Sequence, residues 1–331
     1  MRHLFVINPH SFRTIGSLKR ILMDMENCFS VGRRMEYKIY ISRRPRDAVA
    51  AVRRYLLTVP PQETVRVYAV GGDGILFDCL NGMVRFPNAE LTSVPYGSAN
   101  DFVRAFGDDA APAFRDIKAL SAAPSRPVDV IHCGPNFALI EVNVGLVGQT
   151  VIHANTFLRH TNLNRMRRFT PHVYTLAALK SVTNMDIIRQ KYTVSIDGED
   201  MSGSYCNIHI ANIPCDGGAF VPSPYAVPDD GLLDVIFLSG NRSVDVIKRI
   251  GDRNSGHFEK HTAFVYKKCR TVTIQSDLQL CTQMDGEAFY THEVTLEIIP
   301  GGIKFFAPQG LDFADYSHRA YRKEKGGGNH G

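Results

Sequence analysis

The stretch Val65-Arg66-Val67-Tyr68-Ala69-Val70-Gly71-Gly72-Asp73-Gly74 is the part of the sequence that decides the fold. Its apolar first half is typical of a buried strand, and its glycines come directly before a predicted helix at 75–84. Glycines let a backbone approach a phosphate, to which the N–H groups at a helix N-terminus then donate. Asp73, being an anion, would act through Mg²⁺ or by orienting a hydroxyl. The alternative is a plain strand-to-helix turn that needs positive φ.

Strand-like and helix-like segments alternate around this stretch, over the first third of the chain. Because alternating strands and helices pack as a parallel sheet with crossover helices, we expect an α/β domain here. The predicted strands are 4–7, 37–41, 65–70 and 91–94, and the predicted helices are 18–29, 46–57, 75–84 and 99–106.

The pattern changes at residues 124–130. Beyond them, apolar and polar residues alternate, which indicates a largely antiparallel domain. Its predicted strands are 192–196, 208–211, 233–238, 272–275 and 294–299, and one helix is predicted at 173–182. The composition of 323–331 is typical of disorder. We therefore expect domains at 1–127 and 128–308, followed by a C-terminal segment at 309–331 that packs back on the first domain.

Three more polar loops follow predicted strands of the first domain. The segment Pro95-Tyr96-Gly97-Ser98-Ala99-Asn100-Asp101-Phe102 opens a helix, so Ser98 can donate to a phosphate and Asn100-Asp101 can cap the helix or reach a metal-bound water. Asn8-Pro9-His10-Ser11 and Ser42 follow the first two strands. Each alone is more typical of a turn than of a ligand contact. Together they favour a ligand, since ligands bind at the carboxyl ends of strands in open α/β sheets.

The second domain contains two carboxylate-rich turns. Pro228-Asp229-Asp230-Gly231 is either a solvated turn or a site for a hard cation, held by one carboxylate and backbone carbonyls. Met284-Asp285-Gly286-Glu287 is equally well a hairpin turn, since Asp-Gly is the strongest hairpin dipeptide. Asp197-Gly198-Glu199 repeats the tripeptide, and there we expect a hairpin turn only.

Composition places the chain among globular proteins. It has 331 residues, 44% of them hydrophobic, and a net charge of +5 that is compatible with an anionic ligand or membrane surface but does not indicate nucleic-acid binding. Seven scattered cysteines without a CxxC pair indicate thiols in a reducing compartment. We see no signal peptide, and the longest uncharged run, 142–158, is too short and too polar to span a bilayer. We expect a cytoplasmic protein.

Taken in order, these segments resemble the diacylglycerol kinase catalytic family, which includes sphingosine kinases and bacterial soluble lipid kinases. The family pattern runs from Asn-Pro-x-Ser through Gly-Gly-Asp-Gly-Thr and Gly-Thr/Ser-x-Asn-Asp-Phe to Gly-Gly…Asp-Asp-Gly-x-Leu-Asp-Val and Asp-Gly-Glu. Here it is matched at 7–11, 71–74, 97–102, 217–235 and 285–287. No single motif is specific, but the ordered set is.

The resemblance implies a kinase of lipid metabolism and phospholipid biosynthesis. It would transfer the γ-phosphate of Mg-ATP to the hydroxyl of a diacylglycerol-like or sphingoid lipid. The implied fold is an N-terminal parallel α/β domain of the phosphofructokinase and NAD-kinase type, a C-terminal β-sandwich, and substrate in the cleft between them. It also allows a homodimer.

The resemblance assigns roles to individual residues. Glu287 would deprotonate the lipid hydroxyl, with Asp73 as its catalytic neighbour. Asp230 would hold Mg²⁺ through its carboxylate, and Val227 and Leu232 through backbone carbonyls. The implied nucleotide-binding residues are Asn8, Ser11, Ser42, Gly71, Gly72, Asp73, Gly74, Ile75, Asp78, Ser98, Asn100 and Asp101.

Three departures from the family pattern bear on activity. Ile75 replaces the Thr of the glycine loop, Phe77-Asp78 stands where Asn-Glu is usual, and Phe12-Arg13 replaces a Gly. Two alternatives stay open on this ground: a kinase for a soluble acceptor such as NAD, and a nucleotide-binding protein without catalysis.

The basic segment at 159–191 bears on how a lipid would be reached. It carries six further Arg and Lys residues besides Arg159 against Asp186 alone, and its predicted helix has an apolar face. Such a stretch can lie on an anionic membrane, here the inner membrane surface. The alternative, which we favour, is an apolar face that packs on the second domain.

Overall fold

The first half of the chain forms a parallel sheet. The computed structural model describes residues 1–30, 37–161, 170–218, 220–240 and 264–317. The parallel strands lie in the order β2-β1-β3-β4, and β3 and β4 are buried over their whole length, as their continuous apolar character requires. Their bounds are β1 Arg2–Ile7, β2 Tyr37–Ile41, β3 Val65–Gly71 and β4 Ala89–Pro95.

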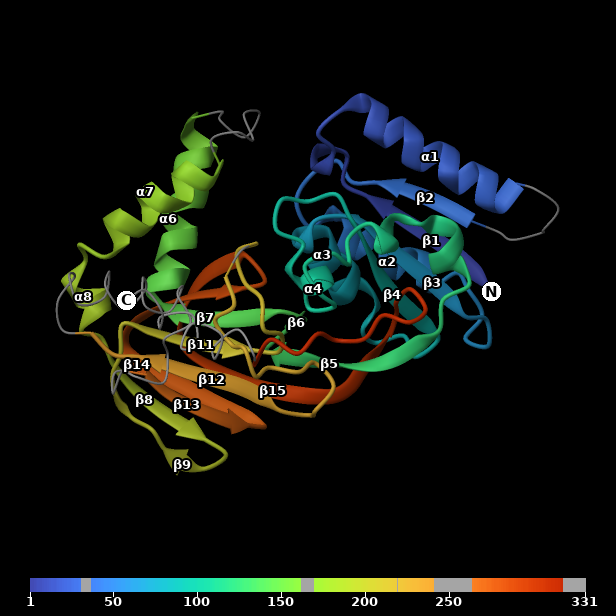
Figure 1. Cartoon of the computed structure of the whole chain (residues 1–331). Helices are drawn as coiled ribbons and strands as arrows, with labels where there is room; N and C mark the ends of the chain where they lie inside the picture. The colour runs from blue at the N-terminus through green and yellow to red at the C-terminus, as the bar shows by residue number, and fades with distance from the viewer. Residues whose placement is uncertain (31–36, 162–169, 219, 241–263, 318–331) are drawn as a thin grey trace, which may run out of the picture.

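Helices connect these strands and cover the sheet (Figure 1). Helix α1 packs with α5, and α2 packs with α3. The α2–α3 contact is close, because a Cβ placed on Gly82 would lie 2.8 Å from Val52 Cβ. The bounds are η1 Pro9–Ser11, α1 Ile15–Ser30, α2 Asp47–Leu56, α3 Asp73–Met83, α4 Asp101–Arg104, η2 Ala113–Arg115 and α5 Ile117–Ser121.

The strand order locates the crevice of this domain. The chain moves from β1 to β2 on one side and from β3 to β4 on the other, so the order reverses between β1 and β3. Open α/β sheets bind ligands at such a point, beyond the carboxyl ends of the strands. The loops that follow β1 and β3 are 8–11 and 71–74, the two that the sequence marks as polar or glycine-rich.

The second half is dominated by antiparallel strands around a separate apolar core. The predicted helix at 173–182 is confirmed as α7, whereas α6 lies in the uncharged run that we had weighed only as a membrane span. The strands are β5 Ser125–Cys133, β6 Asn136–Ala138, β7 Glu141–Gly145, β8 Lys191–Ile196, β9 Glu199–Asp200, β10 Gly203–Ser204, β11 Asn207–Ala211, β12 Leu233–Leu238, β13 Phe264–Cys269, β14 Thr271–Met284 and β15 Glu287–Phe306. The helices are α6 Leu146–Thr161, α7 Thr170–Ser181 and α8 Met185–Ile188.

Two long irregular strands shape this half. The pairing of β14 with β15 shifts register between Gln275 and Leu280, and the pairing of β15 with β5 shifts between Ile299 and Ile303. Such irregularities bend strands, which lets one sheet wrap around its own core. The predicted fold class, a parallel α/β domain followed by a β-sandwich-like domain, is confirmed.

The two halves are joined by strand β15 and by the segment that follows it. The end of β15 runs alongside the parallel sheet, where Lys304 and Phe305 pair with β4. Figure 1 shows β15 extending from the antiparallel part to the parallel part. Further on, the Ala314 N–H donates to Ala105 O and the Tyr316 hydroxyl to Arg104 O, at 2.8 and 2.6 Å. The segment 323–331 lies outside the described residues, and the domain limits at 127 and 308 stay a prediction.

Helices α6 and α7 stand beside each other on the second half and project from it (Figure 1). Helix α6 meets β14 very closely, because a Cβ placed on Gly148 would lie 2.1 Å from Cys281 O. Among the described helices, none has both the length and the apolar character to cross a membrane.

A buried ion pair fastens several elements together. Arg66 Nε lies 2.9 Å from Glu90 Oε2, and its other nitrogens donate to the carbonyls of Leu120, Ser121 and Ala123. The guanidinium also lies 4.7 Å from the ring centroid of Phe306, at the end of β15. One arginine thus links β3, β4, the C-terminal end of α5 with the residues just after it, and β15.

We predict that Arg66→Met lowers the free energy of unfolding by about 3–5 kcal/mol, because Glu90 and three carbonyls lose their buried donor. The control is Lys267→Met, since Lys267 pairs with Glu199 at 3.0 Å but both side chains are exposed; a loss below about 1 kcal/mol is expected there. Urea unfolding measures both. Equal losses in the two variants would contradict this account.

Candidate active site

The loops after β3 and β4 touch through their backbones. A Cβ placed on Gly97 would lie 2.4 Å from Gly72 Cα, so neither position has room for a side chain. The N–H groups of Tyr96 and Gly97 both donate to Gly71 O, at 2.7 and 2.9 Å. Gly72 is the N-cap of α3 and has no side chain to cap it. Its open N-terminus therefore offers backbone donors to an anion.

The loop after β1 packs against the same glycines. A Cβ placed on Gly71 would lie 2.7 Å from Ile75 Cγ2, 3.0 Å from Ser11 Oγ and 3.3 Å from Asn8 Cβ. Ile75 is buried in the core of the first domain. Its side chain therefore packs against Gly71, at the position where the family pattern has the hydroxyl-bearing Thr.

Ser42 has its side-chain hydrogen bonds at the start of α2 rather than with the glycine loop. Its hydroxyl donates to Asp47 Oδ1 at 2.7 Å and helps to fix the start of α2. Its role in nucleotide binding stays a prediction, as does that of the exposed Gly74, which has open space where a Cβ would be.

The segment after β4 is held by its own side chains. Asn100 adopts φ 55° and exchanges two hydrogen bonds with the backbone of Gly97, which shapes the turn that contains Ser98. Asp101 is buried, and its Oδ1 accepts from the Gly218 N–H at 2.8 Å. This bond joins the first domain to the glycine turn at 216–218 of the second.

The Asp-Gly-Glu tripeptide at 285–287 occurs at a hairpin turn between β14 and β15. Asp285 and Gly286 have φ 45° and 88°, nearly the values of 47° and 88° in the turn of Asp197 and Gly198. The surroundings separate the two turns. Asp197 is exposed, whereas Asp285 is buried and accepts from three consecutive backbone N–H groups, those of Leu139, Ile140 and Glu141, at 2.8, 3.1 and 2.9 Å.

This anchoring places Glu287, which is exposed, at the start of β15. Its carboxylate is near enough to Asp78 and to Tyr174 of α7 to raise the pKa of each, in addition to the larger effect of burial. Glu287 therefore lies where the first domain, the β14–β15 hairpin and α7 approach one another.

Carboxylates accumulate at this junction. Burial, followed by the charges of Asp73 and Asp216, raises the pKa of Asp101 to about 8. Burial raises the pKa of Asp285 to about 7, with Asp73 adding to it, and burial also raises the pKa of Asp73. A carboxylate close to another carboxylate ionises less readily, and a divalent cation removes this penalty. Such a group of carboxylates therefore suits a ligand that brings a divalent cation.

Asp78 and Phe77 form a second contact between the domains. Arg46 Nη1 lies 3.6 Å from Asp78 Oδ1, and the guanidinium lies 4.5 Å from the centroid of the Phe77 ring. Phe77 packs into the core of the second domain, and Arg46 Nη2 donates to Asn136 Oδ1 at 3.3 Å. Burial raises the pKa of Asp78 to about 6, although Arg46 opposes this. The departure at 77–78 thus supplies an aromatic contact between domains.

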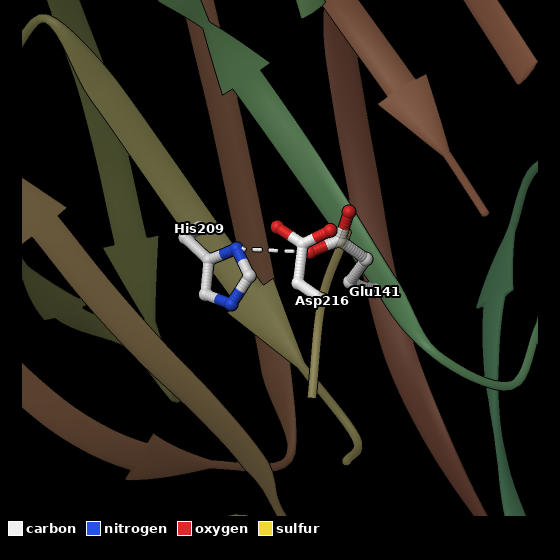
Figure 2. Close-up of side chains that lie close together, drawn as sticks. All are labelled: Glu141, His209 and Asp216. Atoms are coloured by element: carbon white, nitrogen blue, oxygen red, sulfur yellow. Dashed lines mark ion pairs between the residues drawn. The ribbon is translucent and has the colours of Figure 1, made fainter. Parts of the chain in front are cut away.

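One cluster near the site escaped the sequence analysis (Figure 2). Glu141, His209 and Asp216 each place one ligand atom within 4.8 Å of the others, which is a donor set suited to a metal ion. His209 Nδ1 lies 3.2 Å from Glu141 Oε2 and 3.0 Å from Asn143 Oδ1. The available signal was the polar residues that alternate with apolar ones in buried strands β7 and β11.

A hydrogen-bonded path connects this cluster with the hairpin tip. The Gln283 side chain donates to Glu141 Oε1 and accepts from the Gly286 N–H, the latter at 2.8 Å. His209, Glu141 and Gln283 therefore brace the turn that precedes Glu287.

The residues predicted to bind Mg²⁺ lie in a different turn. Asp230 Oδ1 accepts from the Leu232 N–H at 2.9 Å, and the Asp230 N–H donates to Val227 O at 3.4 Å. Asp230 Oδ2 lies 2.6 Å from Lys268 Nζ. An ammonium group thus contacts the carboxylate that the resemblance assigns to a metal, so this donor set does not fit Mg²⁺ as it stands.

We predict that Gly97→Ala lowers the free energy of unfolding by about 1–3 kcal/mol, because its Cβ would force the loops after β3 and β4 apart. Gly74→Ala is the matched control, and a change within about 0.5 kcal/mol is expected there. Urea unfolding distinguishes them. A Gly97→Ala protein as stable as the control would refute the close contact.

We predict that Glu287→Gln lowers the pKa of Asp78, because the substitution removes a nearby negative charge that raises it. Carbon-detected NMR of the side-chain carboxyl follows this titration. Glu293→Gln, on the same strand, should leave it unchanged. An Asp78 pKa that is insensitive to Glu287→Gln would show that the two groups are not neighbours.

Comparison with known proteins finds relatives that match most of this chain. A probable lipid kinase, YegS-like, of Shewanella frigidimarina is 24% identical over 77% of this chain and 80% of its own, and one of Pseudomonas putida is 28% identical over 74% and 77%. A crystal structure of a diacylglycerol kinase from Bacillus anthracis superposes with a TM-score of 0.67 at 18% identity, over 94% of this chain and 98% of that one.

Two family domains together account for most of the sequence. The diacylglycerol kinase catalytic domain matches residues 2–133, and the YegS C-terminal NAD kinase beta sandwich-like domain matches residues 153–307. They follow each other in the order of the parallel and antiparallel halves described above. The chain therefore combines a diacylglycerol kinase catalytic domain with a YegS C-terminal NAD kinase beta sandwich-like domain, and it is similar over most of its length to proteins named as YegS-like lipid kinases.

Proposed function

We propose that this protein is an ATP-dependent lipid kinase that transfers the γ-phosphate of Mg-ATP to the hydroxyl of a diacylglycerol-like or sphingoid lipid. One observation carries the proposal. Asp73 lies at the open N-terminus of α3, and its charge adds to the burial that raises the pKa of Asp285, in the hairpin tip that bears Glu287. A phosphate-binding loop and a candidate base therefore lie at one junction.

The first domain supplies the nucleotide contacts in this proposal. Backbone N–H groups at 72–74 donate to the phosphates, and Ser11, Asn8 and Ser98 line the loops around them. Asp73 and Asp101 would hold Mg²⁺, whose chemistry here is to neutralise phosphate charge. The fit rests on the donor type and on burial, which raises the pKa of both carboxyl groups; the charge of Asp73 raises the pKa of Asp101 further, so a nearby cation would favour both anions.

Glu287 acts as the general base. Its carboxylate accepts the proton of the lipid hydroxyl while that oxygen forms a bond to the γ-phosphorus. The bond from the γ-phosphorus to the bridging oxygen breaks, and ADP leaves with the electron pair. Phosphoryl transfer depends mainly on position and charge, so one oriented carboxylate is sufficient.

The surroundings of Glu287 favour a lipid acceptor over a soluble one such as NAD. The charge of Glu287 adds to the burial that raises the pKa of Tyr174 in α7, so α7 borders the site. Apolar side chains on α6 and α7 are exposed, at 46% for Phe157, 62% for Leu176 and 51% for Leu179. Exposed apolar groups beside a site suit a substrate with acyl chains, met at the surface of a membrane. Arg165, Arg167 and Arg168 lie outside the described residues.

We predict that Glu287→Gln and Asp73→Asn each lower lipid phosphorylation at least about 100-fold, because the first removes the base and the second a phosphate-site carboxylate. Glu293→Gln, an exposed glutamate on the same strand, should keep wild-type turnover. Transfer from radiolabelled ATP to diacylglycerol, to sphingosine and to NAD measures these rates, with circular dichroism as a check on folding.

Each result has a definite meaning. Wild-type turnover in folded Glu287→Gln would remove Glu287 from its role. Label that enters only NAD would favour the soluble acceptor, and ATP binding without transfer to any acceptor would favour a protein without catalysis.

A further inference from the structure

The turn at 228–231 of the second domain is held by hydrogen bonds to the carboxylate oxygens of Asp129. Asp129 of β5 is buried and supports it from both sides, because its two carboxylate oxygens accept from the N–H groups of Gly231 and Gly301, each at 2.7 Å. The Asp129 N–H donates to Pro228 O at 2.8 Å. These bonds fix the backbone of the turn and thereby the direction in which Asp230 projects.

Two carboxylates, Asp230 and Asp234, meet beside this turn. Asp234 lies in β12, directly opposite Lys268 of β13, and its side chain is fully buried. Within the described residues, neither of its carboxylate oxygens has a hydrogen-bond partner. A buried carboxylate without donors requires a cation close by.

Lys268 supplies that cation. Its Nζ lies 2.6 Å from Asp230 Oδ2, 3.1 Å from Tyr225 O and 3.5 Å from Asp234 Oδ2. An ammonium group has three donors, and three oxygens surround this one. The separations to Asp230 and Tyr225 are those of ammonium hydrogen bonds, whereas Mg²⁺ needs six oxygens at about 2.0–2.1 Å.

A metal ion and this ammonium group exclude each other. A cation on Asp230 Oδ2 would occupy the space of Nζ, and two positive charges so close would repel strongly. The other oxygen of Asp230 is already bonded to the Leu232 N–H. The carbonyl of Val227 accepts from the Asp230 N–H.

We propose that Lys268 is a built-in counter-ion, which replaces the divalent cation that family resemblance assigns to Asp230, Val227 and Leu232. The turn is consequently folded without metal, with an ammonium group already in contact with Asp230. This proposal does not depend on the lipid kinase activity, since it concerns a turn distinct from the 71–74 loop and is tested without nucleotide.

The test is thermal unfolding of full-length protein without nucleotide, in EDTA and in 10 mM MgCl₂. We expect Mg²⁺ to shift the Tm of wild type and of Asp230→Asn equally, because Asp230 holds no metal in wild type. Lys268→Met should lower the Tm in EDTA by about 3–6 °C, and Mg²⁺ should restore roughly half of that loss by binding in the vacated place.

Two controls sharpen the result. Lys267→Met, on the neighbouring residue, should behave as wild type, and the double variant Lys268→Met with Asp230→Asn should lose the restoration by Mg²⁺. A wild-type Tm gain from Mg²⁺ that Asp230→Asn abolishes would overturn the proposal, as would a Lys268→Met protein whose Tm is unchanged in EDTA or unaffected by Mg²⁺. If Lys268→Met does not fold, the comparison of wild type with Asp230→Asn still decides.

Discussion

The contact between the backbones of Gly72 and Gly97 is the constraint on which the candidate site depends. It allows the loops after β3 and β4 to share one carbonyl, that of Gly71, as acceptor for two N–H groups. Any side chain at either glycine would separate them. Because β3 also pairs with β1 at the point where strand order reverses, Asn8 and Ser11 of the loop after β1 lie against Gly71 of the same glycine loop.

Two anchored acidic residues, one from each domain, complete this arrangement. Asp101 accepts from the Gly218 N–H, and Asp285 accepts from three consecutive N–H groups that follow β6 and reach the first residue of β7. Both carboxylates are buried, and both have pKa values raised mainly by burial. The hydrogen bonds of Asp285 fix the turn that precedes Glu287. The surplus of negative charge suits a ligand that carries a cation.

Much of this structure could be predicted from local sequence. The strands and crossover helices of the first domain follow from apolar periodicity, and the glycine loop follows from its position after a buried strand. The ordered motifs placed Asp73 and Glu287 in one candidate site. Local pattern alone could not separate Asp285 from Asp197, and only the order of the motifs did. Both turns adopt nearly the same φ values and both carboxylates accept backbone N–H groups, but Asp285 is buried and Asp197 is exposed.

The contacts that escaped prediction are non-local. Glu141 and His209 meet only when β7 and β11 pair, and Lys268 reaches Asp230 only when β13 pairs with β12. Helix α6 was missed because its uncharged composition was weighed as a membrane span rather than as a helix packed on β14. In each case the deciding partner lies far away in the sequence, where a local pattern carries no information.

The central claim is that phosphate passes from ATP bound at the 71–74 loop to a lipid hydroxyl beside Glu287. The most direct measurement is mass spectrometry of a total lipid extract after incubation with the purified protein, ATP and MgCl₂. The account predicts one class of hydroxyl lipid that becomes heavier by a phosphate, and only when ATP is present. An extract in which no lipid gains phosphate, while ATP is consumed on a soluble acceptor, would contradict it.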